Sequence, residues 1–311
     1  MKAVLQYRAS PGLQRRIAAL DVDTVVVDET DTDAFLRAVH DAEVLLHVLE
    51  PVTAAVIDAA PRLRLIQKIG IGVNTIDLDA ARRRGIAVCD MPGTNTQAVA
   101  EMTLLLMLAT LRRVAQLDGL TRAGRGWSIE PGMADDLGEL AGRTVGLVGF
   151  GGVAGRLVPI LQAIGATVIY TSRHAATDSP IRFVRFSEML PLADVLSLHL
   201  PLAAETARII DSAALARMKR GSILINTARG HLVDEKALLD ALTNGHLGAA
   251  GLDVFCREPV GADDPLLKLP NVVVTPHLAW LTVETLERSL VVIAENCRRL
   301  RTGEALLHLV V

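Results

Sequence analysis

Residues 144–158 read "TVGLVGFGGVAGRLV" and carry the most specific fold signal in this chain. This stretch runs from an apolar, β-branched segment through closely spaced glycines into a helical pattern. Gly149 permits a tight turn, and Gly151 lets backbone N–H groups approach a pyrophosphate. The third position of the pattern must be small so that helix and strand pack closely, and Ala154 meets that need. The stretch therefore predicts a strand, a phosphate-binding turn and a helix.

Gly152 and Val153 complete this loop at the N-terminus of the predicted helix, whose partial positive charge favours phosphate. Glycine turns between a strand and a helix are common, so the motif alone is weak. A second apolar strand, "ATVIYTS" (166–172), follows at the expected distance. Strand, loop, helix and second strand together predict a dinucleotide-binding domain.

The residues at the end of that second strand bear on whether the domain binds NAD or NADP. About 20 residues beyond the glycine loop, NAD-binding domains carry an acidic residue that binds the adenosine ribose. Here the chain has Ser172 and Arg173. Serine removes the repulsion that a carboxylate exerts on a 2′-phosphate, and the arginine offers a planar cation to phosphate or adenine. The pattern favours NADP(H), with NAD(H) possible; the alternative is an ordinary solvated turn.

Outward from the glycine loop, short β-branched runs alternate with helical patterns along the whole chain. This alternation is typical of parallel sheets covered by helices, and two series of strands predict two α/β domains. The expected strands lie at 2–7, 23–28, 43–49, 63–70 and 86–90, then at 144–150, 167–172, around 183, and at 194–200, 222–228, 249–255 and 271–277.

Two helical segments bear on the domain organisation. Residues 95–116 are predicted to form one long helix that begins with a polar cap at Asn95. The segment 282–303 forms another helix near the end of the chain. It could pack on its neighbour or return to the first domain, and periodicity does not decide between these.

Composition bounds the class of protein. The chain has 311 residues, 50% of them apolar and 22% charged, and a net charge of −3, so no general electrostatic case for nucleic acid or an acidic membrane exists. Three scattered cysteines without metal-ligand spacing suit a reducing compartment, and no metal is expected. The apolar run at 102–111 is too short to cross a bilayer. We expect a soluble cytoplasmic protein.

Three residues late in the chain stand where predicted strands end. Arg229 ends one strand, Glu258 follows the next, and His277 ends the last. Open parallel sheets bind ligands at the carboxyl ends of their strands. Each residue alone could be a surface charge, a capping group or a core residue, but their joint placement favours a catalytic site.

These motifs are similar to those of the D-isomer-specific 2-hydroxyacid dehydrogenase family, over essentially the full length of the chain. The resemblance is carried by "KIGIGVNTIDLDAARRRGIAV" (68–88), "PGTNTQAVAEMTLLLMLATLRR" (92–113), "GRTVGLVGFGGVAG" (142–155), "DVLSLHLPLAAETARIID" (194–211), "MKRGSILINTARGHLVDEKAL" (218–238), "LDVFCREP" (252–259) and "TPHLAW" (275–280). We expect no regulatory extension of the kind found in the longer phosphoglycerate dehydrogenases of the family.

The resemblance implies a fold of two doubly wound parallel-sheet domains. A Rossmann dinucleotide domain (99–283) is inserted into a discontinuous flavodoxin-like substrate domain (1–98 and 284–311). It also implies a homodimer, held largely through the helix near 97–116 and the segment around Trp127. Substrate and nicotinamide are expected to meet between the domains.

The resemblance also implies residue roles. Arg229 matches the arginine that clamps the carboxylate and keto oxygen of a 2-oxo acid. His277 matches the general acid and base, and Glu258 the partner that orients the imidazole and favours its protonated form. Ile71 and Gly72 match backbone N–H donors to the substrate carboxylate.

Asp253 matches a residue that holds the nicotinamide side of the cofactor. The other expected cofactor contacts are Thr103, Pro201, Thr206, Thr227, Ala228 and Ala279. Two positions depart from many relatives without touching the chemistry: Asn74 replaces an acid and Ala98 replaces a serine. Three further residues have open roles: Trp280 could wall the substrate pocket or pack at a hinge, and His47 and Glu50 could reach the cleft or form a polar pair at a strand end.

The predicted function is reduction of a small 2-oxo acid, of the glyoxylate or hydroxypyruvate kind, to the D-2-hydroxy acid with NADPH. One alternative is a formate- or phosphite-type dehydrogenase on the same scaffold. Formate enzymes resemble the chain less because they have Gln where Glu258 stands, and phosphite enzymes have a lysine in place of Ile71. A nucleotide-sensing binding protein of the corepressor type is the other alternative. The identity of the oxo acid and the physiological direction stay open.

Overall fold

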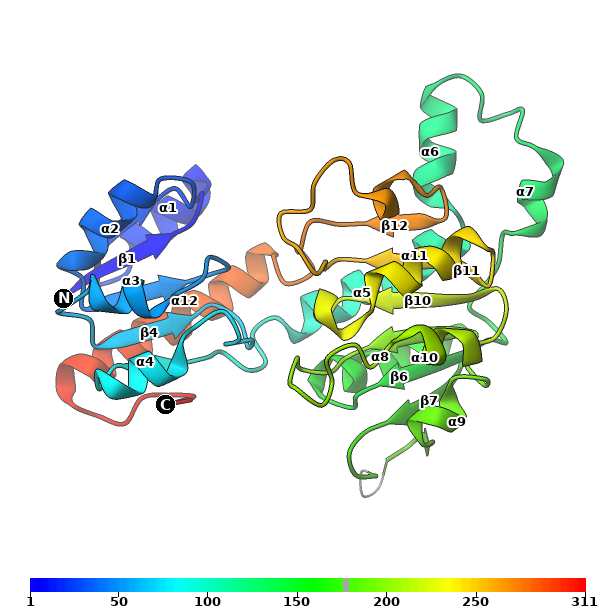
Figure 1. The fold of residues 1–311 in the computed structure, drawn as a ribbon. Coiled ribbons are helices and arrows are strands. Elements are labelled where there is room, and N and C mark those ends of the chain that lie inside the picture. The colour runs from blue at the N-terminus through cyan, green and yellow to red at the C-terminus, as the bar shows by residue number, and fades with distance from the viewer. Residues whose placement is uncertain (176–178) are drawn as a thin grey trace. The chain divides into compact units, whose positions relative to one another are not determined.

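The computed structural model describes residues 1–175 and 179–311. The chain divides into two compact units. Unit 1 consists of Met1–Asn95 and Leu281–Val311, and unit 2 consists of Thr96–Trp280. Each unit is built on a parallel sheet with helices against it (Figure 1). The predicted fold class, two parallel α/β domains, is confirmed.

Unit 1 has a five-stranded sheet in the order β2-β1-β3-β4-β5, with every pair parallel. This is the flavodoxin-like order, in which the chain reverses direction across the sheet between β1 and β3. The strands are β1 (Lys2–Gln6), β2 (Asp23–Val27), β3 (Val44–His47), β4 (Leu65–Lys68) and β5 (Ala87–Cys89).

The helices of unit 1 begin at polar caps that the sequence supplies. Asp31 accepts a hydrogen bond from the backbone N–H of Ala34 at 2.9 Å, and Asp77 does the same for Ala80 at 2.8 Å. Such caps satisfy backbone donors that a helix leaves unpaired at its start. The helices are α1 (Pro11–Ala18), α2 (Thr32–His40), α3 (Ala54–Asp58), α4 (Leu78–Arg83) and α12 (Val283–Thr302).

The position of α12 answers the question that periodicity left open, because this helix returns to unit 1. Asn296 donates to the side-chain oxygen of Gln67 in β4 at 2.6 Å, and both residues are fully buried. Gln67 in turn donates to the carbonyl of Cys89 in β5 at 3.2 Å. Buried polar groups need such partners, so this pair fixes α12 on the sheet.

Unit 2 has a seven-stranded parallel sheet in the order β12-β11-β10-β9-β6-β7-β8. The chain reverses direction between β6 and β9, which is the Rossmann arrangement with one added strand. The strands are β6 (Thr144–Val148), β7 (Thr167–Thr171), β8 (Arg182–Phe183), β9 (Val195–Leu198), β10 (Ser222–Asn226), β11 (Leu247–Leu252) and β12 (Val272–Val274).

Helices cover both faces of this sheet, so its strands are apolar on both sides. In β10, Ile223 and Ile225 join the core beneath α5 and α8, while Leu224 joins the core on the other face, beneath α10 and α11. This alternation follows from the period of two in a strand. The helices of the unit are α5 (Thr96–Leu111), α6 (Val114–Arg122), α7 (Pro131–Asp135), α8 (Gly152–Ile164), α9 (Phe186–Met189), α10 (Ser212–Arg217) and α11 (Glu235–Thr243), with 3-10 turns η1 (Gly230–Leu232) and η2 (Pro265–Lys268).

One prediction about these helices is wrong. The segment 95–116 does not form one helix, because α5 ends at Leu111 and α6 begins at Val114. Between them Arg113 adopts a left-handed conformation with φ 48° and ψ 38°. The guanidinium of Arg113 pairs with Asp136 at 2.7 Å, which ties this break to the segment after α7. The sequence has neither Gly nor Pro at the break, so the helical pattern runs through it without a signal.

Among the helices that the structure describes, none is both long and apolar enough to cross a membrane. Within the same residues, no group of three or more His, Cys, Asp or Glu side chains is placed to hold a metal ion.

Candidate active site

The residues expected to carry chemistry come together at one edge of the unit 2 sheet. Arg229 follows β10, Asp253 and Glu258 follow β11, and His277 follows β12. These three strands are parallel neighbours, so their carboxyl ends share one edge. The topology thus brings together residues that are far apart in the sequence.

His277 and Glu258 form a direct pair. Nδ1 of the imidazole lies 2.7 Å from Oε2 of the carboxylate. The other carboxylate oxygen accepts from the backbone N–H of Phe255 at 2.9 Å. Burial by itself raises the pKa of Glu258, but the hydrogen bond and charge of His277, together with the Phe255 N–H and Arg229, lower it overall. Glu258 is therefore ionised and holds the ring of His277 by Nδ1, which leaves Nε2 for other chemistry.

The backbone of His277 has an unusual conformation. Its φ is 54°, in the left-handed region that few residues other than glycine adopt. Its N–H donates to the carbonyl of Asp253 at 2.8 Å. Non-glycine residues in this conformation persist where the surroundings fix them, and they concentrate at functional sites.

Asp253 organises the turn that carries His277. It is fully buried, and its oxygens accept from the hydroxyl of Thr275 at 2.5 Å and from the N–H groups of Leu278 and Ala279 at 2.9 Å each. Burial raises the pKa of Asp253, and these hydrogen bonds oppose that rise. The carboxylate thus uses three protein donors to fix the segment on both sides of His277.

The turn at Arg229 is fixed by Asn226, the last residue of β10. The side-chain amide of Asn226 donates to the carbonyl of Arg229 at 2.9 Å, and its oxygen accepts from the N–H of Ala228 at 3.0 Å. Burial lowers the pKa of Arg229, and the charge of Glu258 opposes this. The guanidinium is thus a partly buried cation that feels the carboxylate of the His277 pair.

Gly230 explains how the Arg229 turn comes so close to the loop after β11. A Cβ atom at this position would overlap the carbonyl group of Phe255. Only a residue without a side chain lets the two backbones approach this closely. Sequence reasoning missed both Asn226 and Gly230. Their signals were an asparagine that ends an apolar strand and a glycine directly after the arginine.

The glycine loop has the geometry that its sequence predicts. Gly149 has φ 99°, and a Cβ there would come within 2.5 Å of the His199 carbonyl oxygen. Gly151 is the N-cap of α8 without any side-chain cap, and a Cβ there would meet nothing within 4 Å. Ala154 is fully buried. The first glycine is required by its backbone, whereas the second leaves open space at a helix N-terminus suited to an anion.

The turn that is expected to select the cofactor lies directly after β7. Ser172 is half-buried, and its hydroxyl donates to the carbonyl of His174, while the Arg173 side chain is exposed. Both residues therefore follow the end of β7, which pairs with β6, the strand that leads into the glycine loop.

The other expected cofactor contacts mostly make internal bonds. The hydroxyls of Thr103 in α5 and Thr227 after β10 lie 2.8 Å apart, and Thr103 is fully buried. Thr206 donates to the carbonyl of Pro201 at 2.8 Å. These bonds link segments around the carboxyl edge of the sheet.

Trp280 packs behind the His277 turn. It is buried, and its indole N–H donates to the carbonyl of His277 at 3.1 Å. Packing against the turn is therefore the role that this contact supports.

In unit 1, Ile71 and Gly72 lie in the loop after β4, and the Ile71 side chain is exposed. His47 ends β3 and is buried, and its Nε2 lies 2.8 Å from the carbonyl of Glu50. These residues belong to the carboxyl edge of their own sheet.

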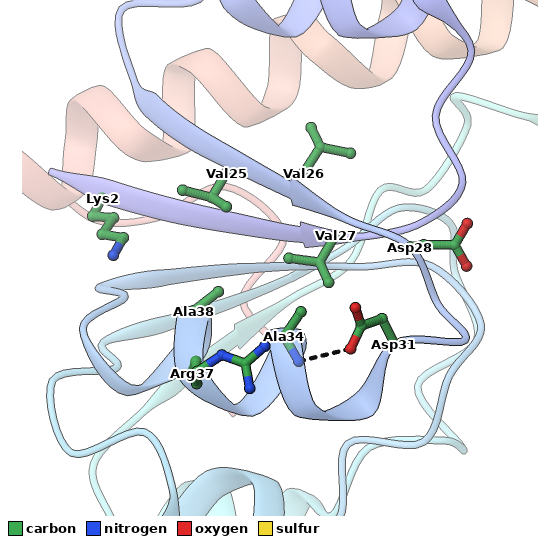
Figure 2. A pocket seen from close by; sticks show the side chains of 9 residues that line it. All are labelled: Lys2, Val25, Val26, Val27, Asp28, Asp31, Ala34, Arg37 and Ala38. Atoms are coloured by element: carbon green, nitrogen blue, oxygen red, sulfur yellow. Dashed lines mark hydrogen bonds between the residues drawn. The ribbon is translucent and has the colours of Figure 1, made fainter.

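A separate surface hollow of unit 1 lies over the edge strand β2 and α2 (Figure 2). It is lined by Lys2, Val25, Val26, Val27, Asp28, Asp31, Ala34, Arg37 and Ala38. None of the residues with expected chemistry lines it, and the bond drawn in Figure 2 is the helix cap from Ala34 to Asp31. The hollow does not mark the candidate site.

Comparison with known proteins identifies relatives over almost the whole chain. Residues 104–279 match the family described as D-isomer specific 2-hydroxyacid dehydrogenase, NAD binding domain. A D-3-phosphoglycerate dehydrogenase of Mycobacterium leprae is 41% identical over 94% of the chain, but the chain spans only 56% of that relative. A glyoxylate reductase of Korarchaeum cryptofilum is 38% identical, with 86% of the chain and 82% of the relative covered.

A solved structure of similar fold aligns with nearly the whole chain. The NADPH-dependent glyoxylate/hydroxypyruvate reductase of Sinorhizobium meliloti, in complex with NADP and malonate, superimposes with a TM-score of 0.85. It is 28% identical, and the alignment covers 99% of this chain and 96% of that one.

Proposed function

The chain belongs to the D-isomer-specific 2-hydroxyacid dehydrogenase family, and we propose that it reduces a small 2-oxo acid of the glyoxylate or hydroxypyruvate kind to the D-2-hydroxy acid, with NADPH as the preferred cofactor. The observation that carries this proposal is the 2.7 Å pair between His277 and Glu258, which lies at the same sheet edge as Arg229. A proton donor and a cation at one edge suit a substrate with a carbonyl and a carboxylate.

In this mechanism His277 is the general acid. A bound nicotinamide cofactor supplies the hydride that the carbonyl carbon receives. Glu258 engages Nδ1 of the imidazole, so the proton that reaches the carbonyl oxygen comes from Nε2. The ionised carboxylate favours the imidazolium before transfer and keeps the ring oriented after it. Oxidation of the hydroxy acid reverses these steps, with neutral His277 as the base.

Arg229 binds the substrate carboxylate and keto oxygen in the same proposal. Its planar fork of donors matches a planar anion better than an ammonium group does. A partly buried cation also stabilises the negative charge that develops on the keto oxygen as hydride arrives. The bonds from Asn226 and the close fit of Gly230 hold this cation in place.

Unit 2 is then the dinucleotide domain, and unit 1 the substrate domain that offers the N–H groups of Ile71 and Gly72. The open space at Gly151 and the uncapped start of α8 fit a pyrophosphate. Ser172 and Arg173 would bind the 2′-phosphate of NADP by donating hydrogen bonds to it. To do so, the Ser172 hydroxyl must give up its present hydrogen bond to the His174 carbonyl. The NADP-bound relative from Sinorhizobium meliloti supports this preference.

A homodimer is part of the proposal. Trp127 lies between α6 and α7, which stand away from the sheet of unit 2 (Figure 1), and its side chain is 96% exposed. Leu105, Leu108 and Val114 in the neighbouring helices are also exposed apolar residues. Large apolar side chains left exposed to water on neighbouring elements are candidates for burial in an interface. A cytoplasmic location remains a prediction.

The test is a set of initial rates of cofactor oxidation. The panel contains glyoxylate, hydroxypyruvate, pyruvate and, because of the phosphoglycerate dehydrogenase relative, 3-phosphooxypyruvate, each with NADPH and with NADH. Preference for NADPH with glyoxylate or hydroxypyruvate supports the proposal. Turnover confined to the phosphorylated acid would replace its substrate, and no turnover with any acid would refute the reductase function.

His277→Gln then tests the mechanism, because glutamine keeps a polar side chain of similar reach without a transferable proton. We expect a loss of at least about 100-fold in kcat with little change in NADPH affinity. A large loss of cofactor affinity would contradict the role of His277 as the acid.

A further inference from the structure

Two loops at the carboxyl edge of the unit 1 sheet run side by side. One follows β3 and includes Glu50, and the other follows β4 and includes Ile71 and Gly72. β3 and β4 are parallel neighbours, and the N–H of Ile69 extends their pairing by donating to the carbonyl of His47 at 2.8 Å. The two loops therefore leave the sheet from adjacent positions.

Further bonds hold the two loops together beyond the strands. The N–H of Val52 in the first loop donates to the carbonyl of Thr75 in the second at 2.9 Å. His47 adds a link inside the pair, because its Nε2 lies 2.8 Å from the Glu50 carbonyl oxygen and 3.3 Å from the Thr75 hydroxyl oxygen. Glu50 is thus fixed by its backbone beside the turn at residues 70–74.

The side chain of Glu50 takes no part in this arrangement. The residue is exposed, and its carboxylate makes no hydrogen bond or ion pair with any residue that the structure describes. Its negative charge is therefore not offset by a contact at this edge of the sheet. A substitution of the carboxylate can change the charge without removing a bond that shapes the loop.

We propose that Glu50 is a specificity-determining residue, which excludes 2-oxo acids with a second negative group and so restricts the enzyme to monoanionic substrates. This inference rests on the proposed function, in which the N–H groups of Ile71 and Gly72 bind the substrate carboxylate. These donors and Arg229 compensate that first carboxylate. A phosphate or second carboxylate on the same small acid has no such donors assigned to it and meets the charge of Glu50.

Electrostatic repulsion has the range that this role requires. At physiological ionic strength charges are screened over about 8 Å. A small acid held at the turn falls within that range, since the backbones of neighbouring strands are about 4.8 Å apart. A phosphate group carries a charge of about −1.5 to −2 at pH 7, so Glu50 repels it more strongly than it repels a carboxylate.

The experiment compares Glu50→Gln with the wild-type enzyme in the full chain, with NADPH as cofactor. Glyoxylate and hydroxypyruvate represent the monoanionic acids, and oxaloacetate and 3-phosphooxypyruvate carry a second negative group. We expect kcat/KM for the latter pair to rise by about tenfold relative to glyoxylate, mainly through KM, with Tm unchanged. Glu50→Asp should keep the wild-type selectivity because it keeps the charge.

A matched control and a change of salt separate this role from a general effect of charge. Asp41→Asn removes one negative charge from an exposed position before the amino end of β3, and it should leave the selectivity unchanged. Because salt screens the repulsion, the selectivity of the wild type against oxaloacetate should shrink as ionic strength rises. Glu50→Gln should show less of this salt dependence.

An unchanged selectivity in Glu50→Gln would overturn the inference, and so would an equal change in Asp41→Asn. A wild type that prefers 3-phosphooxypyruvate also overturns it, because Glu50 then does not exclude a phosphate. A wild-type enzyme without turnover on any 2-oxo acid refutes the proposed function itself. An active wild type with unchanged selectivity in the variant refutes only the role of Glu50.

Discussion

Nδ1 of His277 lies 2.7 Å from a carboxylate oxygen of Glu258, although the two residues are 19 positions apart and follow different strands. The pair depends on β11 and β12 being parallel neighbours and on the turn that Asp253 fixes around His277. The relationship is therefore a product of the whole sheet edge, and it can be tested by changing either member.

Glu258→Gln should lower stability in a pH-dependent way. The pKa of Glu258 is lowered overall, so its ionised form stabilises the folded state above the ordinary glutamate pKa of about 4.3, and this contribution is lost as pH falls through the lowered value. Because the side chain is about one third exposed, we expect Tm at pH 7 to fall by only roughly 1–3 °C. Thermal unfolding between pH 3 and pH 8 should show this difference shrink in acid; a constant difference would contradict the account.

The same variant reports on catalysis. Glutamine still accepts a hydrogen bond from Nδ1 but carries no negative charge, so it stabilises the imidazolium less than Glu258 does. Proton transfer in either direction passes between the neutral and the cationic ring, so kcat should fall by at least about tenfold for both reduction and oxidation, with NADPH affinity nearly unchanged. Steady-state kinetics in both directions with a cofactor titration would check this, and an unchanged kcat would show that Glu258 does not act through His277.

Arg229→Lys should behave as a severe change despite the retained charge. Lysine loses the planar fork and the bond that the Arg229 guanidinium makes to the Ala228 carbonyl at 2.6 Å. We expect kcat/KM for the 2-oxo acid to fall by about 100-fold, with NADPH affinity nearly unchanged. Steady-state kinetics with a fluorescence titration of NADPH would check this, and wild-type kcat/KM in the lysine variant would refute the clamp.

Two glycine-to-alanine changes should have opposite consequences. Gly230→Ala places a Cβ against the backbone of Phe255, so the Arg229 turn must shift and Tm should fall clearly. Gly151→Ala meets open space and should fold normally, but its methyl group occupies the place of the expected pyrophosphate. Thermal unfolding and NADPH titration of both variants separate these effects. Unchanged cofactor affinity in Gly151→Ala would contradict the glycine-loop site.

Ser172→Asp tests the cofactor choice. A carboxylate at this position repels a 2′-phosphate and accepts hydrogen bonds from the ribose of NAD. We expect the ratio of kcat/KM for NADPH to that for NADH to fall by at least about tenfold. Arg182→Ala, a variant of an exposed arginine in β8, serves as a control for charge alone. An unaltered ratio in Ser172→Asp would mean that this turn does not read the cofactor.

The Trp127 side chain should report on assembly. If this exposed side chain lies in a dimer interface, Trp127→Ala should weaken association, because tryptophan contributes large buried area at such surfaces. Sedimentation or light scattering over a range of concentrations measures the change. Val25→Ala, at an exposed apolar position of unit 1, is a matched control. A monomeric wild type would refute the homodimer.

Much of the fold could be predicted because its signals are local. Short apolar runs predicted the strands of both sheets, and polar caps marked the starts of helices. The alternation of strands and helices predicted two parallel α/β units. The break at Arg113 escaped prediction because its left-handed conformation carries no glycine or proline signal, and its ion pair with Asp136 joins residues 23 positions apart.

The sequence pointed to the candidate catalytic residues but not to the residues that hold them in place. Arg229, Glu258 and His277 stand at strand ends that the pattern reveals. Asn226 and Gly230 were missed. Asn226 acts through its side-chain bonds to the backbone of Ala228 and Arg229 in the turn that follows it, and Gly230 matters because the backbone of Phe255, 25 positions along the chain, lies against it.

The pattern of side chains was enough to identify the strands, most of the helices, the glycine-rich turn after β6 and the side chains that end each strand. Those properties follow from side-chain periodicity and from backbone preferences over a few residues. The family resemblance implied that the last helix joins unit 1 and that Glu258 partners His277, but the contacts that achieve this come from the tertiary structure: Asn296 with Gln67 in one unit, and His277 with Glu258 in the other. Such contacts depend on which strands become neighbours, because hydrogen bonds and ion pairs act over a few ångströms in space and take no account of distance along the chain.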